Sequence, residues 1–310
     1  MSFLIGGEIL DIDLTWEKGE EFLIKDGLIF PTSATLTMSD VLFKNTNTFS
    51  VEYSPFDTKS QRPVYEAFAK LGKKLIGNDK PENYILSFYK EYGRLDLYHF
   101  YRDKHLLYNF TTKYNHKIIY GERIIDIKNE AIRFYLLTQI YKTLKEIGLD
   151  GCLSDMDKTN KILSMVKDID NLPDIYGIRT LWYDDLLQKL VKVDDEGSFY
   201  SFMNIIYGTL IGEFRYYLDT VQMHLNFPDR KGHNENNITT YIVKPRFSFS
   251  VSSLLSIIYL TYLNSINTNK IGYCEICGGV LYKSSKNKRV HTDCSNRMRQ
   301  KRHNKKSLQG

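Results

Sequence analysis

The chain has 310 residues, of which 42% are hydrophobic and 14% aromatic, and its 42 Lys and Arg against 37 Asp and Glu give a formal net charge of +5. This composition supplies enough apolar surface for a sizeable core and excludes a disordered chain. Residues 283–306 hold ten Lys or Arg and one acid, a net charge of +9, which leaves 5 − 9 = −4 for the rest. A mildly acidic body with a strongly basic end indicates one localised electrostatic footprint.

The beginning of the chain lacks the basic start of a signal peptide and meets acidic residues early. The most apolar stretch, residues 252–266, is shorter than the ~18 residues that a membrane-spanning helix needs. Three of the four cysteines lie in the last forty residues, which favours metal binding in a reducing compartment over disulfides. The fourth, Cys152, has no basic cluster near it and is expected to be a packing residue. The sequence therefore predicts a soluble cytoplasmic protein with no membrane partner.

The first part of the chain alternates polar and apolar side chains between turn residues, for example over residues 8–14, 21–24 and 48–53. This pattern predicts a strand-rich N-terminal segment over residues 1–60.

Helical patterns follow. Pro63 opens a predicted helix that ends at Leu75, and a second helix is expected to end at Tyr92, before Gly93. Between residues 122 and 148, apolar residues at helical spacing predict a long amphipathic helix that Gly148 stops. The remaining expected elements are helices at 155–168, 177–192, 198–225 and 252–266 and a short strand at 239–249.

These elements predict an α+β fold with a mainly helical body at residues 61–268 that forms one domain with residues 1–60. A small zinc-binding module with a basic C-terminal helix is expected at residues 269–310.

The zinc prediction depends on two ligand pairs. Cys274 and Cys277 form a Cys-x2-Cys pair followed by two glycines, and after thirteen intervening residues come His291 and Cys294. Two thiolates on a tight turn and a second pair at a helix start give the four N and S ligands that tetrahedral zinc requires. Four protein ligands leave no position for water, so one structural Zn²⁺ is expected. His303 is an alternative to His291 as the fourth ligand.

The module is expected to be treble-clef-like. Residues 280–282 alternate like a hairpin strand, to which residues 289–291 can return. His291 and Cys294 are spaced i, i+3 and share one face of the helix that begins there.

The basic run after the second ligand pair is interpreted as a nucleic-acid-binding surface. In a helix that begins at the ligands, Arg297, Lys301 and Lys305 form one stripe, and binding to phosphates would be sensitive to salt. Duplex DNA is preferred over RNA because only Tyr273 and Tyr282 could stack on single-stranded bases. A solvated tail and another acidic partner remain alternatives. The predicted contacts are Lys286, Lys288, Arg289, Arg297, Arg299, Lys301, Arg302, Lys305 and Lys306.

The segment Cys294-Ser295-Asn296-Arg297 resembles the Cys-Gly-Asn-Arg signature of the CGNR-type zinc fingers, which end bacterial proteins regarded as stress-related transcription regulators. Residues 89–97, YKEYGRLDL, are similar to a YGxLxL element of the N-terminal domains joined to such fingers. The close match covers about 40 residues. Ser295 stands for Gly, and His291 stands where the family more often has Cys. The resemblance implies that the finger binds DNA and that the body has an effector or partner role.

The sequence carries no phosphate-loop, dinucleotide, zincin or hydrolase motif, so the chain is predicted not to be an enzyme. His99, Asp103 and His105 form the most acid/base-like cluster of the body and are interpreted as polar residues at the edge of a helix or loop. The predicted function is zinc-dependent DNA binding in transcription regulation. The alternatives are a protein-interaction scaffold with a structural zinc and a His-Asn-His-type nuclease, which would need a free catalytic His and a second metal.

Overall fold

The computed structural model describes residues 2–5, 8–11, 16–19, 22–31, 50–53, 63–97, 107–112, 115–149, 154–170, 199–219, 221–226, 246–251 and 253–307. This part of the chain is mainly helical with small antiparallel sheets, which confirms the coarse fold prediction. The predicted helix at 177–192, Cys152 and the His99, Asp103 and His105 cluster lie outside the described residues.

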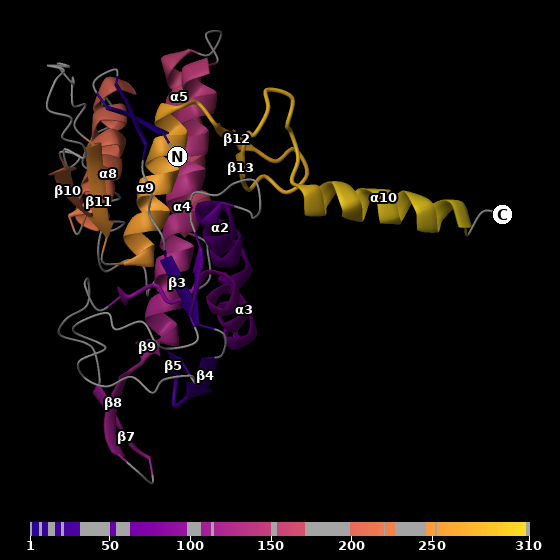
Figure 1. The fold of residues 1–310 in the computed structure, drawn as a ribbon. Coiled ribbons are helices and arrows are strands. Elements are labelled where there is room, and N and C mark those ends of the chain that lie inside the picture. Colours follow the sequence, from indigo (N-terminus) through magenta and orange to yellow (C-terminus); the bar gives the residue numbers. More distant parts are fainter. Residues whose placement is uncertain are drawn as a thin grey trace, which may run out of the picture.

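The described helices are α2 (Val64–Leu75), α3 (Glu82–Tyr92), α4 (Ile124–Leu149), α5 (Asp155–Asp170), α8 (Phe199–Leu218), α9 (Leu254–Asn267) and α10 (Thr292–Ser307). Helix α4 runs through the middle of the molecule, with α2 and α3 on one side and α8 and α9 on the other (Figure 1). Helix α10 projects away from this body, with the C-terminus at its far end (Figure 1).

The strand-rich start is confirmed. The strands in it are β1 (Ser2–Ile5), β2 (Glu8–Asp11), β3 (Trp16–Gly19), β4 (Phe22–Lys25), β5 (Leu28–Pro31) and β6 (Ser50–Tyr53). The later strands are β7 (Leu107–Thr112), β8 (Asn115–Tyr120), β9 (Glu122–Arg123), β10 (Val221–Asn226), β11 (Arg246–Val251), β12 (Ile271–Tyr273) and β13 (Val280–Tyr282). The antiparallel sheets have the strand orders β1-β2, β3-β6, β4-β5-β9, β7-β8, β10-β11 and β12-β13.

The first two helices end where the sequence predicts. Pro63 stands directly before α2, where its missing N–H costs nothing. Gly93 follows α3 with φ 91°, a conformation that glycine adopts most readily. Helix α2 lies very close to α4 at Gly72. A Cβ built on this residue would be only 1.9 Å from the carbonyl oxygen of Ala131. Only glycine at this position permits so close an approach of the two backbones.

The helix predicted at 122–148 is present as α4, but it differs from the prediction in its start, its end and its burial. Residues 122 and 123 form β9, and the helix continues past Gly148 to Leu149. Residues 130–134 are all buried, which is more than one full helical turn, whereas Ile125, one of the apolar residues at helical spacing, is 46% exposed. The reason is that α2 packs against α4 while rings of α9 contact Phe134 from another side, so apolar spacing along one stripe does not report the environment of α4.

The predicted helix at 198–225 is too long. Helix α8 ends at Leu218, and residues 221–226 form β10, which pairs antiparallel with β11. A hydrogen-bonded partner strand from later in the chain decides this segment, and a local pattern cannot register it. The predicted strand at 239–249 overlaps β11, although its first part lies outside the described residues.

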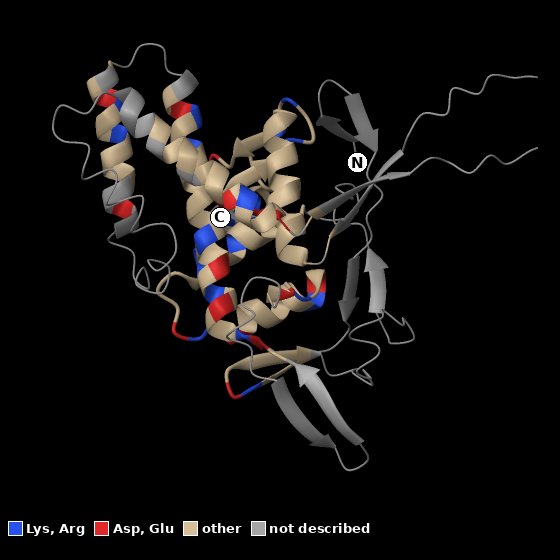
Figure 2. Cartoon of the chain, turned by 90° about the vertical axis from the view of Figure 1, so that its left-hand side faces the viewer, with Lys and Arg blue, Asp and Glu red and all other residues tan. Residues whose placement is uncertain are grey.

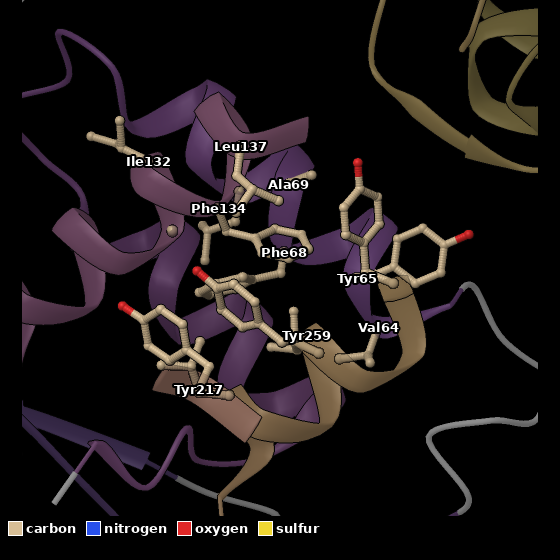
Figure 3. Packing of buried hydrophobic residues seen from close by; sticks show 14 of the residues in the cluster. Val64, Tyr65, Phe68, Ala69, Ile132, Phe134, Leu137, Tyr217 and Tyr259 are labelled. Atoms are coloured by element: carbon tan, nitrogen blue, oxygen red, sulfur yellow. The ribbon is translucent and has the colours of Figure 1, made fainter. Parts of the chain in front are cut away.

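Aromatic rings fill the centre of the helical body. The ring of Phe134 on α4 lies 5.6 Å from that of Phe68 on α2 and 5.1 Å from that of Tyr259 on α9, centroid to centroid. Tyr217 of α8 stacks on Tyr259 at 4.0 Å (Figure 3). The high aromatic content therefore serves the core here, as large rings bury much apolar area each.

Two buried polar groups brace this core. Tyr217 donates to Glu130 at 2.6 Å, and Arg133 donates to the same carboxylate at 3.1 Å. Nearby, burial raises the pKa of Glu213 to about 7.

Glu122 is the second buried carboxylate. It accepts hydrogen bonds from the Tyr89 hydroxyl at 3.0 Å and from the Leu97 backbone N–H at 2.8 Å. The YGRLDL element is thus fixed to the start of α4 through a carboxylate.

Candidate metal centre

The four predicted zinc ligands come together. One ligand atom from each of Cys274, Cys277, His291 and Cys294 lies within 4.8 Å of the other three. Cys274 and Cys294 are buried, and the other two are half-buried. The cluster is complete without His303, which lies about two and a half turns beyond Cys294 on α10 and whose side chain is not described.

The first pair sits on a tight turn between β12 and β13. The Cys274 backbone N–H donates to the Gly279 carbonyl at 2.9 Å, and the Gly278 N–H donates back to Cys274 at 2.8 Å. Gly278 has φ 68°, in the left-handed region where a side chain is strained. This turn brings Cys274 and Cys277 to the same side.

The second pair stands at the start of α10. His291 directly precedes the helix and Cys294 lies in its first turn. The predicted return strand at 289–291 is wrong, because β13 pairs with β12 and not with a later segment. Residues 283–291 instead form a loop that is fastened to the turn by a hydrogen bond from the Glu275 N–H to the Arg289 carbonyl, 3.1 Å long.

The imidazole of His291 has a defined orientation. Its Nδ1 faces the sulfur atoms, 3.4 Å from that of Cys277 and 3.9 Å from that of Cys294. Its Nε2 lies 2.8 Å from the carbonyl oxygen of Val280. A carbonyl only accepts, so the proton is on Nε2 and the Nδ1 lone pair points into the cluster. Zn–S bonds of about 2.3 Å and Zn–N bonds of about 2.0 Å give tetrahedral edges of about this size.

The thiols differ in acidity. Burial raises the pKa of Cys274, but hydrogen bonds from the backbone N–H groups of His291, Cys277 and Ile276 outweigh it and leave the pKa below its usual value. Burial and the neighbouring thiols raise the pKa of Cys277 to about 11. Several thiolates can coexist in this space when a cation offsets their charge, which is the condition that a metal site fulfils.

Cationic side chains surround the cluster. Arg297 donates to the sulfur of Cys294, one helical turn away, at 3.5 Å. Its guanidinium therefore lies against the cluster of four ligand side chains. Lys73 of α2 donates to the Cys277 carbonyl at 2.6 Å. With Zn²⁺ bound, three thiolates, one neutral imidazole and the ion would sum to −1, a charge that these two cations would offset.

The hairpin β12–β13 belongs to the core of the body. Ile271, Val280 and Leu281 are at most 2% exposed. The hydroxyl of Tyr273 donates to the Thr138 carbonyl on α4 at 3.1 Å, and Lys145 of α4 donates to the Ile271 carbonyl at 3.0 Å. The proposed boundary near residue 269 stays a prediction, but no gap in the packing marks it among the described residues.

Helix α10 differs from this hairpin. Arg297, Arg299 and Lys301 are exposed on it, and the predicted contacts Arg302, Lys305 and Lys306 are helical residues whose side chains are not described. In the preceding loop, Lys286 and Arg289 are exposed and Lys288 is half-buried. By contrast, the helices of the body carry acidic and basic residues side by side (Figure 2).

One residue beside the cluster was not predicted from the sequence. Glu66 of α2 is 4% exposed, accepts a hydrogen bond from the Tyr282 backbone N–H and lies 3.9 Å from Nε2 of His291. It precedes the ligands by more than 200 residues and carries no motif, so no local signal could have linked it to them.

Comparison with known proteins does not assign the chain to a family. The chain matches no protein-family model, and neither curated proteins nor solved structures are significantly similar to it. None of the described helices combines the length and the apolar character needed to cross a bilayer.

Proposed function

We propose that this chain is a zinc-dependent DNA-binding protein that acts in transcription regulation. The observation that carries the proposal is the attachment of an exposed, strongly basic helix to a Cys-Cys-His-Cys cluster (Figure 1). The first ligand pair, on the turn of a β-hairpin, and the second ligand pair, at a helix start, form a treble-clef-like module. One structural Zn²⁺, held by Cys274, Cys277, His291 and Cys294, would fix the start of α10.

The size and charge of α10 suit duplex DNA. Its 16 residues span about 24 Å at about 1.5 Å per residue, and the major groove admits an α-helix. The net charge of +9 over residues 283–306 provides the phosphate attraction that supplies non-specific affinity.

The pattern around α10 suggests how it would lie in the groove. Asn296, Gln300 and Asn304 recur every fourth residue and are exposed, so amide side chains occupy one face. Amides can bond bidentately to adenine. The stripe of Arg297, Lys301 and Lys305 borders this face on one side, and Arg299 and Lys306 on the other. Uncharged hydrogen-bonding groups flanked by cations favour base contacts in the middle and phosphate contacts at the edges.

The contact between Arg297 and Cys294 gives the resemblance to CGNR-type zinc fingers a physical basis. An Arg three residues after a Cys at a helix start faces the same way and can donate to its thiolate, as Arg297 does to Cys294. Kinship with that family is part of the proposal.

The test is a titration of the full-length zinc protein with duplex DNA over a salt series. The variant Lys301→Gln/Lys305→Gln removes two charges from α10, and the control Lys80→Gln/Lys90→Gln removes two exposed charges from the body. We expect the first to weaken binding and to reduce the slope of log K against log salt by about 1.8, and the control to leave both unchanged. Gln300→Ala should reduce discrimination between duplex sequences while leaving that slope unchanged.

Failure would take distinct forms. A protein with one zinc and no DNA affinity at low salt would favour the scaffold. Cleavage of DNA in added Mg²⁺ would favour the nuclease and contradict the prediction that the chain is not an enzyme. Equal effects of the two double variants would mean that α10 is not the contact surface.

A further inference from the structure

A carboxylate from the body lies behind the metal cluster. The side chain of Glu66 is 3% exposed, and its Oε2 is 3.9 Å from Nε2 of His291. Its Oε1 accepts from the backbone N–H of Tyr282, at the end of β13. A buried carboxylate costs free energy unless hydrogen bonds or charges offset it, so this position calls for a reason.

The geometry excludes a direct hydrogen bond to the ring. A separation of 3.9 Å is too long for one, and Nε2 donates instead to the Val280 carbonyl at 2.8 Å. Glu66 therefore acts on His291 in two ways. It fixes the strand that presents the Val280 carbonyl, and its negative charge attracts the Nε2–H dipole.

We infer that Glu66 is a positioning residue of the metal site, which α2 contributes from the body and which sets the tautomer and orientation of His291. This inference rests on the proposed zinc site. Groups that accept the non-ligating N–H of a metal-bound His orient the ring and raise its basicity, and their loss costs ~10–100-fold in metal affinity. Here the Val280 carbonyl is that acceptor. Glu66 supports it through β13 and adds a charge, so removal of this charge should cost less, up to ~10-fold.

A coupling between zinc and the body follows. Zinc on Nδ1 draws electron density from the ring and makes Nε2–H a stronger donor, so the attraction of Glu66 is greater with metal bound. By linkage, whatever Glu66 adds to zinc binding, zinc adds to the packing of α2 against the hairpin. Lys73, which donates to the Cys277 carbonyl, joins the same helix to the first ligand pair.

The experiment compares Glu66→Gln with the matched control Glu91→Gln, an exposed acid on α3. Glutamine keeps an acceptor for Tyr282 and removes the charge, which favours a folded variant. Zinc affinity is measured by competition with a chromophoric chelator, and the imidazole is followed by its ¹⁵N shifts and by the absorption of bound Co²⁺. We expect Glu66→Gln to bind zinc more weakly, by up to ~10-fold, with altered His291 shifts, and Glu91→Gln to equal the wild type.

A second pair of variants isolates the role of the imidazole. His291→Cys keeps four ligands, but a thiolate beside Glu66 is repelled rather than attracted. In that background Glu66→Gln should no longer weaken zinc binding and should strengthen it slightly.

The outcomes separate the inference from the proposed zinc site. A wild type that binds no zinc overturns both. One zinc per wild-type chain, with unchanged affinity and unchanged His291 shifts in Glu66→Gln, overturns the inference alone. The same loss of affinity in the wild-type and the His291→Cys backgrounds would also overturn it, because Glu66 would then act on the fold and not through the ring.

Discussion

The two halves of the C-terminal segment are built in opposite ways. The hairpin β12–β13 is buried, and both α2 and α4 contact it through hydrogen bonds. Helix α10 stands away from the body, and its described side chains after Ser295 are all exposed (Figure 1). Each half contributes two ligands to the metal cluster. The cluster is therefore the joint between a part that the core stabilises and a part that it does not.

Helix α10 has little of its own to keep it folded. A helix of 16 residues is marginal in water, and an amphipathic face packed on the body is absent from its exposed turns. Arg297, Lys301 and Lys305 are like charges at i, i+4 spacing, which repel one another. Packing therefore contributes little to the order of α10, and a metal ion bound at its first turn would supply that order.

The largest expected effect is that of Cys274→Ser. With three ligands left, zinc content should fall from one per chain to none, and α10 should lose its protection from amide hydrogen exchange. Because the hairpin is part of the core, the free energy of unfolding should fall by more than about 4 kcal/mol. Zinc analysis, hydrogen exchange and denaturant unfolding on the same sample measure all three.

The matched control is Cys152→Ser, which removes a cysteine that is not a predicted ligand. It should retain one zinc and a protected α10. A protected α10 in zinc-free Cys274→Ser protein would contradict this prediction, since the helix would then need no metal.

A smaller effect is expected where α2 meets α4. Gly72→Ala places a Cβ 1.9 Å from the Ala131 carbonyl oxygen, so the two helices must separate, at a cost of about 3 kcal/mol. Gly212→Ala on α8 is the control, because its new Cβ meets nothing within 4 Å and should stabilise by about 0.5–1 kcal/mol. Unfolding in urea measures both.

The Gly72→Ala variant should also affect the metal module, because α2 carries Glu66, Lys70 and Lys73, which contact that module. In Gly72→Ala protein the zinc affinity should fall along with the stability. A variant that loses stability but binds zinc like the wild type would mean that the module is independent of α2.

Features that depend on neighbours in the chain could be predicted from the sequence. Cys-x2-Cys before two glycines and a His and Cys at i, i+3 both encode a local geometry, and the structure brings all four side chains together. Pro63 and Gly93 mark helix ends for reasons that act within one turn. These signals need no knowledge of the rest of the fold.

Features that depend on distant segments could not. The strand that pairs with β13 is β12, which precedes the first ligand pair, and not a later segment. The burial of α4 depends on helices from both ends of the chain. Glu66 and Tyr282 are 216 residues apart. A lone Glu in a predicted helix is ordinarily a solvated residue, and only the packing of α2 on the hairpin changes its meaning.

The smallest expected effect concerns the ion pair between α10 and the body. Lys70 and Asp293 are 2.9 Å apart, but their side chains are 42% and 48% exposed, so the pair should contribute less than about 1 kcal/mol. Lys70→Gln removes the pair and leaves the attraction of Asp293 to the helix N-terminus, whereas Asp293→Asn removes both. We expect both variants to keep one zinc, a protected α10 and a nearly unchanged free energy of unfolding. That free energy should be slightly lower for Asp293→Asn than for Lys70→Gln. If Lys70→Gln instead cost several kcal/mol or disordered α10, a surface contact and not the metal would determine how the helix is attached. The basic helix would then be docked on the body, and its projection would no longer follow from the zinc joint.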